Sequence, residues 1–186
     1  MLRDRRRVLV VGCGGAGKST FSRELARITG LPLIHLDLHY WHPGWVPTPE
    51  ETWNRRVAEL IEQESWIMDG NYANSLAVRL ARCDAIVFFD ISRWTCLWTA
   101  LRRVVVHRFE RRPDLPAGCR ESVDWTFLRW IWNFPTQSRP RLVAALESVD
   151  GEKVAVVRIA RRGQTSALLS AAGGWRCRSS AGRGSS

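Results

Sequence analysis

Short apolar runs alternate along this chain with longer segments whose apolar residues recur every three or four positions. Five runs have the length and composition of strands, at residues 8–11, 33–38, 66–69, 85–90 and 154–159. The longer segments predict helices that end at Gly30, begin at Thr48, cover 76–80, start at Ser92, surround 123–134 and cover 139–146. Strands that alternate with helices predict an α/β fold with a parallel sheet and right-handed crossovers.

Two helix boundaries have specific signals. Gly30, with Pro32 beyond it, is expected to stop the first helix. At the second boundary we expect Thr48 to be the N-cap and Pro49 to occupy the first turn, and Glu51 completes a capping box. One domain is expected over residues 1–172, and the segment 173–186, rich in Gly, Ser and Arg, is predicted to be disordered.

The segment between the first strand and the first helix reads G-x-x-x-x-G-K-S. Its glycines permit positive φ, so that successive backbone N–H groups can point at an anion. Lys18 is predicted to reach the β- and γ-phosphates of a nucleotide, and the Ser19 hydroxyl to enter the shell of a magnesium ion. The pattern therefore predicts a P-loop NTPase that binds ATP and Mg²⁺. The expected nucleotide-binding residues are Gly12, Gly14, Gly15, Ala16, Gly17, Lys18, Ser19 and Thr20.

Three aspartates lie at the carboxyl ends of predicted strands, where the ligand crevice of a parallel sheet lies. Asp69, which precedes Gly70, is the expected magnesium partner alongside Ser19, and Asp37 is the expected substrate-side residue. Asp90 is the weakest of the three candidates. For each aspartate the alternative is a strand-end residue that caps the next turn.

The segment around Asp37 leaves two further interpretations open. His35, Asp37, His39 and His42 have the residue types of a zinc or iron site. The rings of Tyr40, Trp41 and Trp45 would stack on a planar base or a sugar, or else pack in the ordinary way.

Charge and cysteine content restrict the possible functions less than the motifs do. Of 28 cationic residues only Lys18 and Lys153 are lysines, and the net charge of +10 fits an anionic ligand, nucleic acid or an acidic membrane equally well. The five cysteines form no C-x-x-C pair, so we expect reduced thiols without zinc. No segment approaches the roughly 20 apolar residues of a membrane span. A cytoplasmic protein with no membrane partner is expected.

Arginines gather on both sides of a Pro- and Gly-containing loop predicted over 110–119. Arg102, Arg103 and the cluster 108–112 precede this loop, and Arg139 and Arg141 follow the next helix. Because phosphoryl transfer depends on positive charge around the moving group, these arginines are suited to a lid that closes over a nucleotide. The alternative for most of them is a solvated basic surface.

Several motifs together resemble the P-loop kinases related to adenylate kinase and, more narrowly, the family of DNA topology modulation proteins. The resemblance covers about residues 8–146 and is carried by the phosphate loop and by the segments 30–32, 66–72 and 112–115, which read GLP, WIMDGNY and RPDL. It implies a three-layer sandwich with five parallel strands in the adenylate-kinase order. It also implies a substrate-side region around 37–64 and an arginine lid around 103–141.

Two departures from that pattern affect the expected site residues. Asn71 and Tyr72 stand where nucleoside monophosphate kinases have Phe-Pro-Arg, so Arg55 or Arg56 is expected to hold the substrate instead. Thr99 stands where adenylate kinases carry a lid-helix arginine, which leaves Arg103 as the expected nucleotide contact.

The leading hypothesis is an ATP-dependent phosphotransferase that moves the γ-phosphoryl group of ATP to a small acceptor, nucleotide-like or otherwise. Lys18, Arg103 and Arg139 would stabilise the transferring charge, while Asp37 and Arg55 bind the acceptor. One alternative is a nucleic-acid-associated regulator that uses ATP as a switch, although the sequence shows no nucleic-acid-binding motif. Another is a non-catalytic ATP binder. The oligomeric state is not predicted.

Overall fold

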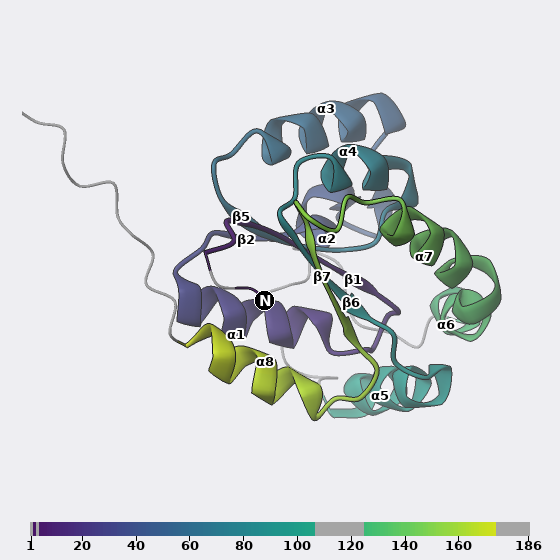
Figure 1. Ribbon diagram of the computed structural model, residues 1–186. Helices are drawn as coiled ribbons and strands as arrows, with labels where there is room; N and C mark the ends of the chain where they lie inside the picture. Colours follow the sequence, from purple (N-terminus) through teal and green to yellow (C-terminus); the bar gives the residue numbers. More distant parts are fainter. Residues whose placement is uncertain (1, 3, 107–124, 174–186) are drawn as a thin grey trace, which may run out of the picture.

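A five-stranded parallel sheet lies at the centre of the computed structural model, which describes residue 2, residues 4–106 and residues 125–173 (Figure 1). Its strand order is β2-β5-β1-β6-β7. The bounds are Leu33–His35 for β2, Trp66–Asp69 for β5, Arg7–Gly12 for β1, Ala85–Phe89 for β6 and Ala155–Ile159 for β7. If these five strands are renumbered 1 to 5 along the chain, their order across the sheet is 2-3-1-4-5. All neighbouring strands are parallel, which confirms the predicted α/β fold with five parallel strands.

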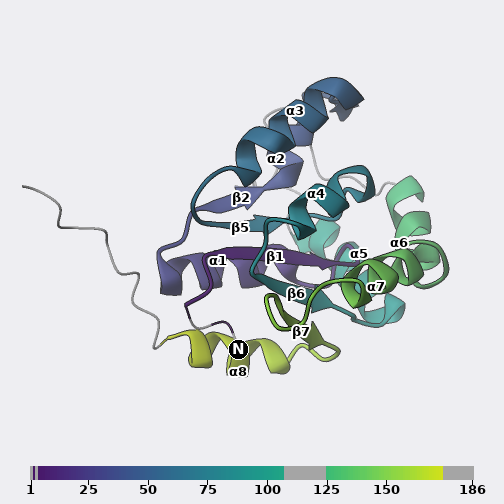
Figure 2. The same ribbon diagram turned by 45° about the horizontal axis from the view of Figure 1, so that its top comes forward.

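Helices cover both faces of this sheet. α1 and α8 lie against one face, whereas α3, α4 and α7 lie against the other (Figures 1 and 2). α5 and α6 lie beyond the carboxyl ends of β1 and β6. The helices are α1 (Lys18–Thr29), α2 (Leu36–Tyr40), α3 (Glu50–Ile61), α4 (Leu76–Leu80), α5 (Arg93–Val106), α6 (Trp125–Gln137), α7 (Arg139–Glu147) and α8 (Gln164–Ala172).

Two small elements complete the substrate-side region and the turn after β5. β3 (Trp41–His42) and β4 (Val46–Pro47) form an antiparallel hairpin, and the 3-10 turn η1 (Ala73–Ser75) precedes α4. Within the described part of the chain, no helix has the length and apolar character needed to cross a membrane.

The core lies on both faces of the central strands. Every residue of β5 and β6 is buried, as are the last five residues of β1. Covered strands of this kind read as continuous apolar runs rather than as an alternation. For this reason the apolar runs at 8–11, 66–69 and 85–90 predicted the three central strands correctly.

Local details differ from the predicted elements at two places. The run 33–38 is a strand only as far as His35, which pairs with Asp69 at the end of β5; beyond that pair the chain turns into α2. Thr48 is not the N-cap of α3, because Pro49 takes that position and the Thr48 hydroxyl instead donates to the Tyr40 carbonyl oxygen at 2.6 Å. The hairpin β3–β4 and α8 were not predicted.

The glycine stop is confirmed. Gly30 adopts φ +72° and its N–H donates to the Ala26 carbonyl oxygen at 2.8 Å, which closes α1. The predicted loop at 110–119, the cluster 108–112 and the tail beyond residue 173 lie outside the described residues. The single-domain boundary at 172 stays a prediction.

Candidate phosphate-binding site

The loop between β1 and α1 has the backbone that a phosphate cradle requires. Gly12, Gly15 and Gly17 adopt φ values of +139°, +75° and +99°, which L side chains rarely adopt. Gly17 is the N-cap of α1, so the helix begins at Lys18 and its first N–H groups border the loop. The amino end of α1 thus supplies the positive end of a helix dipole at this place.

The Lys18 side chain contacts the backbone of the phosphate loop. Its Nζ donates to the Cys13 carbonyl oxygen at 2.9 Å, and its side chain is half-buried. The ammonium group is also close enough to Asp37 to lower the pKa of that carboxyl by its charge. Ser19 is half-buried beside it, whereas Thr20 is exposed on the first turn of α1.

Two acidic residues and a histidine gather where β2 and β5 end. The strand register places His35 opposite Asp69, and His35 Nδ1 lies 3.2 Å from Asp69 Oδ2. Asp69 is 5% exposed, and its negative charge raises the pKa of the Asp37 carboxyl. Asp69 thus lies at the carboxyl edge of the sheet, in the strand whose following turn contacts the phosphate loop that carries Lys18.

Asp37 is held by Tyr72. The Tyr72 hydroxyl donates a short hydrogen bond to Asp37 Oδ1. Asp37 is an exposed residue, yet the protein atoms around its carboxyl group raise the pKa of Asp37, chiefly by desolvation, while the bond from Tyr72 acts in the opposite direction. Burial, and then the charge of Asp37, raises the pKa of Tyr72 far above its ordinary value, so the phenol keeps its proton.

Asn71 fastens the phosphate loop to the turn after β5. Its Nδ2 donates to the Gly12 carbonyl oxygen at 2.7 Å, and the Gly12 N–H donates to its Oδ1 at 2.9 Å. This pairing follows from the register: Val10 is opposite Asp69, so two residues later Gly12 is opposite Asn71. The amide therefore continues the β1–β5 ladder by one side-chain pair beyond the last strand residue.

A fully buried arginine holds the same turn from the other side. Arg79 of α4 donates from Nη1 to the Gly70 carbonyl oxygen at 2.9 Å and from Nη2 to the carbonyl oxygens of Asn71 and Tyr72, the latter at 2.8 Å. Burial lowers the pKa of Arg79 to about 10, so the guanidinium stays charged at neutral pH. The segment that presents Asn71 and Tyr72 is thus fixed through its backbone.

The other side of the phosphate loop is covered by α5 and α6. A Cβ on Gly15 would lie 2.4 Å from the Cys96 carbonyl oxygen of α5, and one on Gly14 would lie 2.6 Å from the tip of the Phe127 ring of α6. The Cys96 thiol donates to the Ile91 carbonyl oxygen at 3.8 Å, and the interaction between the neighbouring Cys13 and Cys96 thiols raises the pKa of Cys13 and lowers that of Cys96. Only glycine fits this close approach of helices to loop.

Arg162 is a cation at the phosphate loop that the sequence did not single out. It lies in the turn between β7 and α8, and its Nη2 donates to the Gly15 carbonyl oxygen at 3.0 Å and to the Thr99 hydroxyl. Thr99 is the position where a lid-helix arginine was missing from the pattern. A guanidinium from the distant end of the chain therefore occupies the neighbourhood of that position.

Arg139, a predicted catalytic residue, forms an ion pair with Asp90 in this structure. Its Nε and Nη2 donate to the two carboxylate oxygens of Asp90 at 2.7 and 2.8 Å, and Arg158 of β7 pairs with the same carboxylate. These bonds, that from Arg139 above all, lower the pKa of Asp90. The pair joins the start of α7 to the end of β6.

The other predicted arginines are distributed more widely. Arg103 is half-buried in the last turn of α5 and Arg55 is on the exposed face of α3. Arg56 forms an ion pair with Glu59 at 3.0 Å, and its Nη2 lies 3.5 Å from His39 Nδ1. The structure therefore does not place Arg55 in contact with Asp37.

The histidines considered as metal ligands have separate partners. His35 faces Asp69, His39 faces Arg56, and His42 Nε2 lies 3.2 Å from the Thr48 hydroxyl. Among the described residues no group of three or more His, Cys, Asp or Glu side chains is arranged to hold a metal ion. The nearby rings pack mostly on one another: centroid distances are 4.9 Å for Tyr40–Trp41, 5.0 Å for Tyr40–Trp53, 4.6 Å for Tyr40–Tyr72, 4.8 Å for Trp53–Tyr72 and 5.6 Å for Trp41–Trp45.

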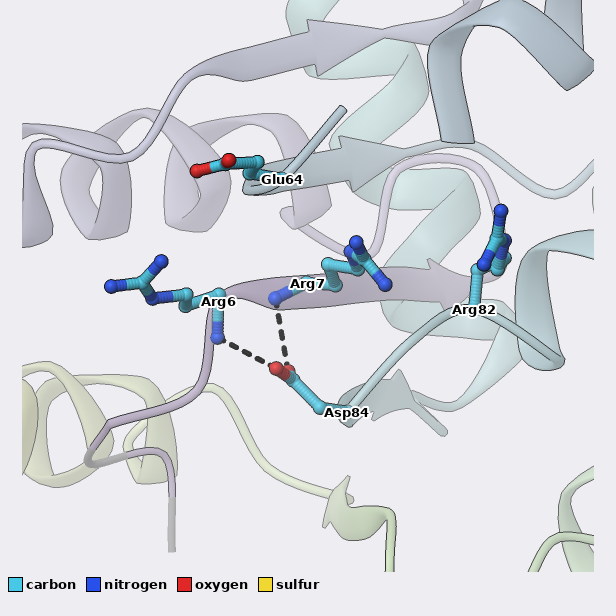
Figure 3. A pocket seen from close by; sticks show the side chains of 5 residues that line it. All are labelled: Arg6, Arg7, Glu64, Arg82 and Asp84. Carbon is cyan, nitrogen blue, oxygen red and sulfur yellow. Dashed lines mark hydrogen bonds between the residues drawn. The ribbon is translucent and has the colours of Figure 1, made fainter. Parts of the chain in front are cut away.

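A surface hollow lies at the opposite edge of the sheet from this cluster. It is lined by Arg6, Arg7, Glu64, Arg82 and Asp84, which stand at or just before the amino ends of their strands (Figure 3). The Asp84 carboxylate accepts the backbone N–H groups of Arg6 and Arg7 at 2.8 and 2.9 Å. Ligands of parallel sheets bind at the carboxyl ends, so the candidate site is the loop and its acidic neighbours.

Comparisons with known proteins agree with this architecture. No protein-family model matches the chain, and no curated protein matches its sequence. The solved structure of a shikimate kinase from Acinetobacter baumannii in complex with shikimate aligns over 91% of this chain and 92% of its own, with a TM-score of 0.52 and 14% identity. A shikimate kinase from Bacteroides thetaiotaomicron aligns over 90% and 95%, with a TM-score of 0.52 and 16% identity. The chain therefore has the fold of P-loop kinases such as these.

Proposed function

We propose that the protein is a phosphotransferase that moves the γ-phosphoryl group of ATP to a hydroxyl group of a small acceptor. The observation that carries the proposal is the contact of the phosphate loop with the turn after β5, at the same edge of the sheet as Asp69 and, through Tyr72, Asp37. The phosphate loop would hold the nucleotide on one side of this point, and Asp37 would face the acceptor on the other. The narrower resemblance to adenylate kinases and DNA topology modulation proteins belongs to the same proposal.

The residues would divide the chemistry among them. The acceptor oxygen attacks the γ-phosphorus, the bond from that phosphorus to the bridging oxygen breaks, ADP leaves, and the acceptor proton passes to the Asp37 carboxylate. Lys18 would stabilise the charge on the phosphoryl oxygens, and the raised pKa of Asp37 makes it a stronger base than an ordinary aspartate. Tyr72 holds Asp37 in place through its hydrogen bond.

The donor set fits magnesium bound chiefly through phosphate oxygens. Ser19 offers a hydroxyl and Asp69 a carboxylate, which are the hard oxygen donors that this ion takes alongside phosphates. When bound, the ion would neutralise part of the phosphate charge. The expected magnesium residues therefore remain Ser19 and Asp69.

Arg162 joins the set of proposed nucleotide contacts. Its guanidinium already lies against the Gly15 carbonyl oxygen, whereas Arg139 is paired with Asp90 and would have to leave that carboxylate to act on phosphate. We therefore propose Arg162 and Arg103 as the arginines that join Lys18 at a bound nucleotide, with Arg139 as a structural pair to Asp90.

The test is phosphorus NMR of Mg-ATP with purified protein and a pool of nucleoside monophosphates, nucleosides and small hydroxylated metabolites. A phosphorylated product is expected. Lys18→Ala should lower the rate of its formation by at least about a hundredfold, because the loop lysine stabilises negative charge in the transition state. Lys153→Ala is the matched control, since Lys153 is the other lysine and its side chain is 83% exposed. Free phosphate alone, or tight binding without turnover, would replace the proposal with an ATP switch or a non-catalytic ATP binder.

A further inference from the structure

The outer faces of α5 and α6 carry an unusual set of exposed aromatic side chains. Trp98 is 69% exposed, Trp94 66%, Trp125 79% and Trp132 42%, and Leu101 between them is 40% exposed. Large apolar residues scattered singly over a surface need no explanation, but a contiguous group of them marks an interaction site.

These side chains form two stripes that meet. Trp94, Trp98 and Leu101 have the i, i+4, i+7 spacing of one helix face, and Trp125 and Trp132 lie seven residues apart on α6. The rings of Trp94 and Trp132 touch edge to face, with centroids 5.1 Å apart. The two stripes therefore meet at the Trp94–Trp132 contact, and we call the exposed apolar residues of both helices the α5–α6 tryptophan face.

The charged residues of the two helices that carry this face have one sign. Arg93, Arg102 and Arg129 lie on the same two helices, and α5 and α6 contain no acidic residue. A second copy of the chain would bring like charges together and is disfavoured. The face is complementary to a partner that is both apolar and anionic.

The aromatic geometry distinguishes between two such partners. Binding to single-stranded nucleic acid relies on free ring faces that stack on bases. Here the Arg93 guanidinium lies 4.7 Å from the Trp132 ring centroid and Trp94 contacts the same ring, so Trp132 is engaged within the protein. Leu101 offers nothing to a base, yet an aliphatic side chain beside tryptophans is what the interfacial region of a bilayer accepts.

We propose that the α5–α6 tryptophan face docks on an anionic lipid surface. The tryptophan rings and Leu101 would enter the headgroup region, and Arg102 and Arg129 would pair with lipid phosphates. The two helices would lie on the bilayer without crossing it. This proposal departs from the expectation of no membrane partner, which followed from the lack of a membrane-spanning segment in the sequence.

The experiment is co-sedimentation of the full chain with phosphatidylcholine vesicles that contain or lack phosphatidylglycerol. Binding is expected only with the anionic lipid and should weaken as salt is added. The double variant Trp98→Ala/Trp125→Ala should lower vesicle affinity by roughly tenfold or more, because two largely exposed rings lose their burial. Arg102→Gln/Arg129→Gln should also lower it, by roughly tenfold.

A matched control separates the face from general basic adhesion. Trp45 is 40% exposed on the β3–β4 hairpin, and Trp45→Ala should leave vesicle affinity unchanged. Circular dichroism of each variant checks folding, and both Trp98 and Trp125 are exposed enough that their loss should not alter it. Equal binding by the Trp98→Ala/Trp125→Ala variant, absence of vesicle binding, or binding only to a labelled single-stranded oligonucleotide would each overturn the proposal.

Discussion

Replacing Asn71 by alanine tests whether the turn after β5 holds the phosphate loop in shape. The substitution removes both hydrogen bonds to the buried Gly12 backbone, at 2.7 and 2.9 Å. Each such bond contributes about 0.5–1.5 kcal/mol net, and a buried backbone group left without a partner costs about 1–3 kcal/mol. The free energy of unfolding should therefore fall by about 2–4 kcal/mol, which lowers the Tm by roughly 10 °C for a chain of this size.

Urea denaturation followed by circular dichroism measures this difference, and calorimetric titration with Mg-ATP measures its consequence for the loop. Affinity should weaken, because an unfastened loop must be ordered when the nucleotide binds. Asn74→Ala is the matched control: Asn74 is exposed and its amide lies 3.4 Å from Glu50, so its loss should change stability by less than about 0.5 kcal/mol. An Asn71→Ala protein as stable as the Asn74→Ala protein would refute the reasoning.

Three further substitutions test other parts of the account. Asp90→Asn should cost about 1–2 kcal/mol at pH 7, because the bidentate pair with Arg139 is partly buried. The pKa of Asp90 is depressed in the folded state, so its contribution is present above the ordinary carboxyl pKa and is lost as pH falls through the folded value; unfolding curves of both proteins should converge in acid. Arg79→Met should cost about 3 kcal/mol or more, measured in urea, because three turn carbonyls lose their buried donor; a near-neutral change would contradict the proposed support. Gly15→Ala should destabilise more than Gly17→Ala, since both have positive φ but only the first places a Cβ 2.4 Å from a backbone oxygen; equal losses in a thermal melt would argue against that contact.

The sheet and the phosphate loop were predictable because their signals are local. Covered strands appear as apolar runs, and the glycines of the loop are required by backbone conformation alone. The boundary at His35 was not predictable in this way, because β2 ends where its partner β5 ends, and that pairing joins residues far apart in the sequence. The N-cap of α3 was predicted wrongly for a similar reason: Thr48 stands one residue before the cap, and its hydroxyl donates to the Tyr40 carbonyl oxygen of α2, a contact that no local signal announces.

The residues of the candidate site also differ in whether a local sequence signal predicts them. Lys18, Asp37 and Asp69 lie at or after strand ends, so topology alone places them on the carboxyl side of the sheet. The clasp of Asn71 on Gly12 depends on register, which becomes readable only when β1 and β5 are known to be neighbours. Arg162 carries no local signal, because its partner lies 147 residues earlier in the chain.

The measurement that tests the central claim most directly is turnover and Mg-ATP affinity of Asp37→Asn, with the acceptor found by phosphorus NMR. Asn keeps the size of the side chain but cannot take up the acceptor proton, so kcat should fall by about a hundredfold or more while the Kd for Mg-ATP stays within about threefold. Asp150→Asn, at an exposed position next to a surface turn, is the control and should leave both unchanged. Undiminished turnover by Asp37→Asn would contradict the assignment of the acceptor site to this carboxylate.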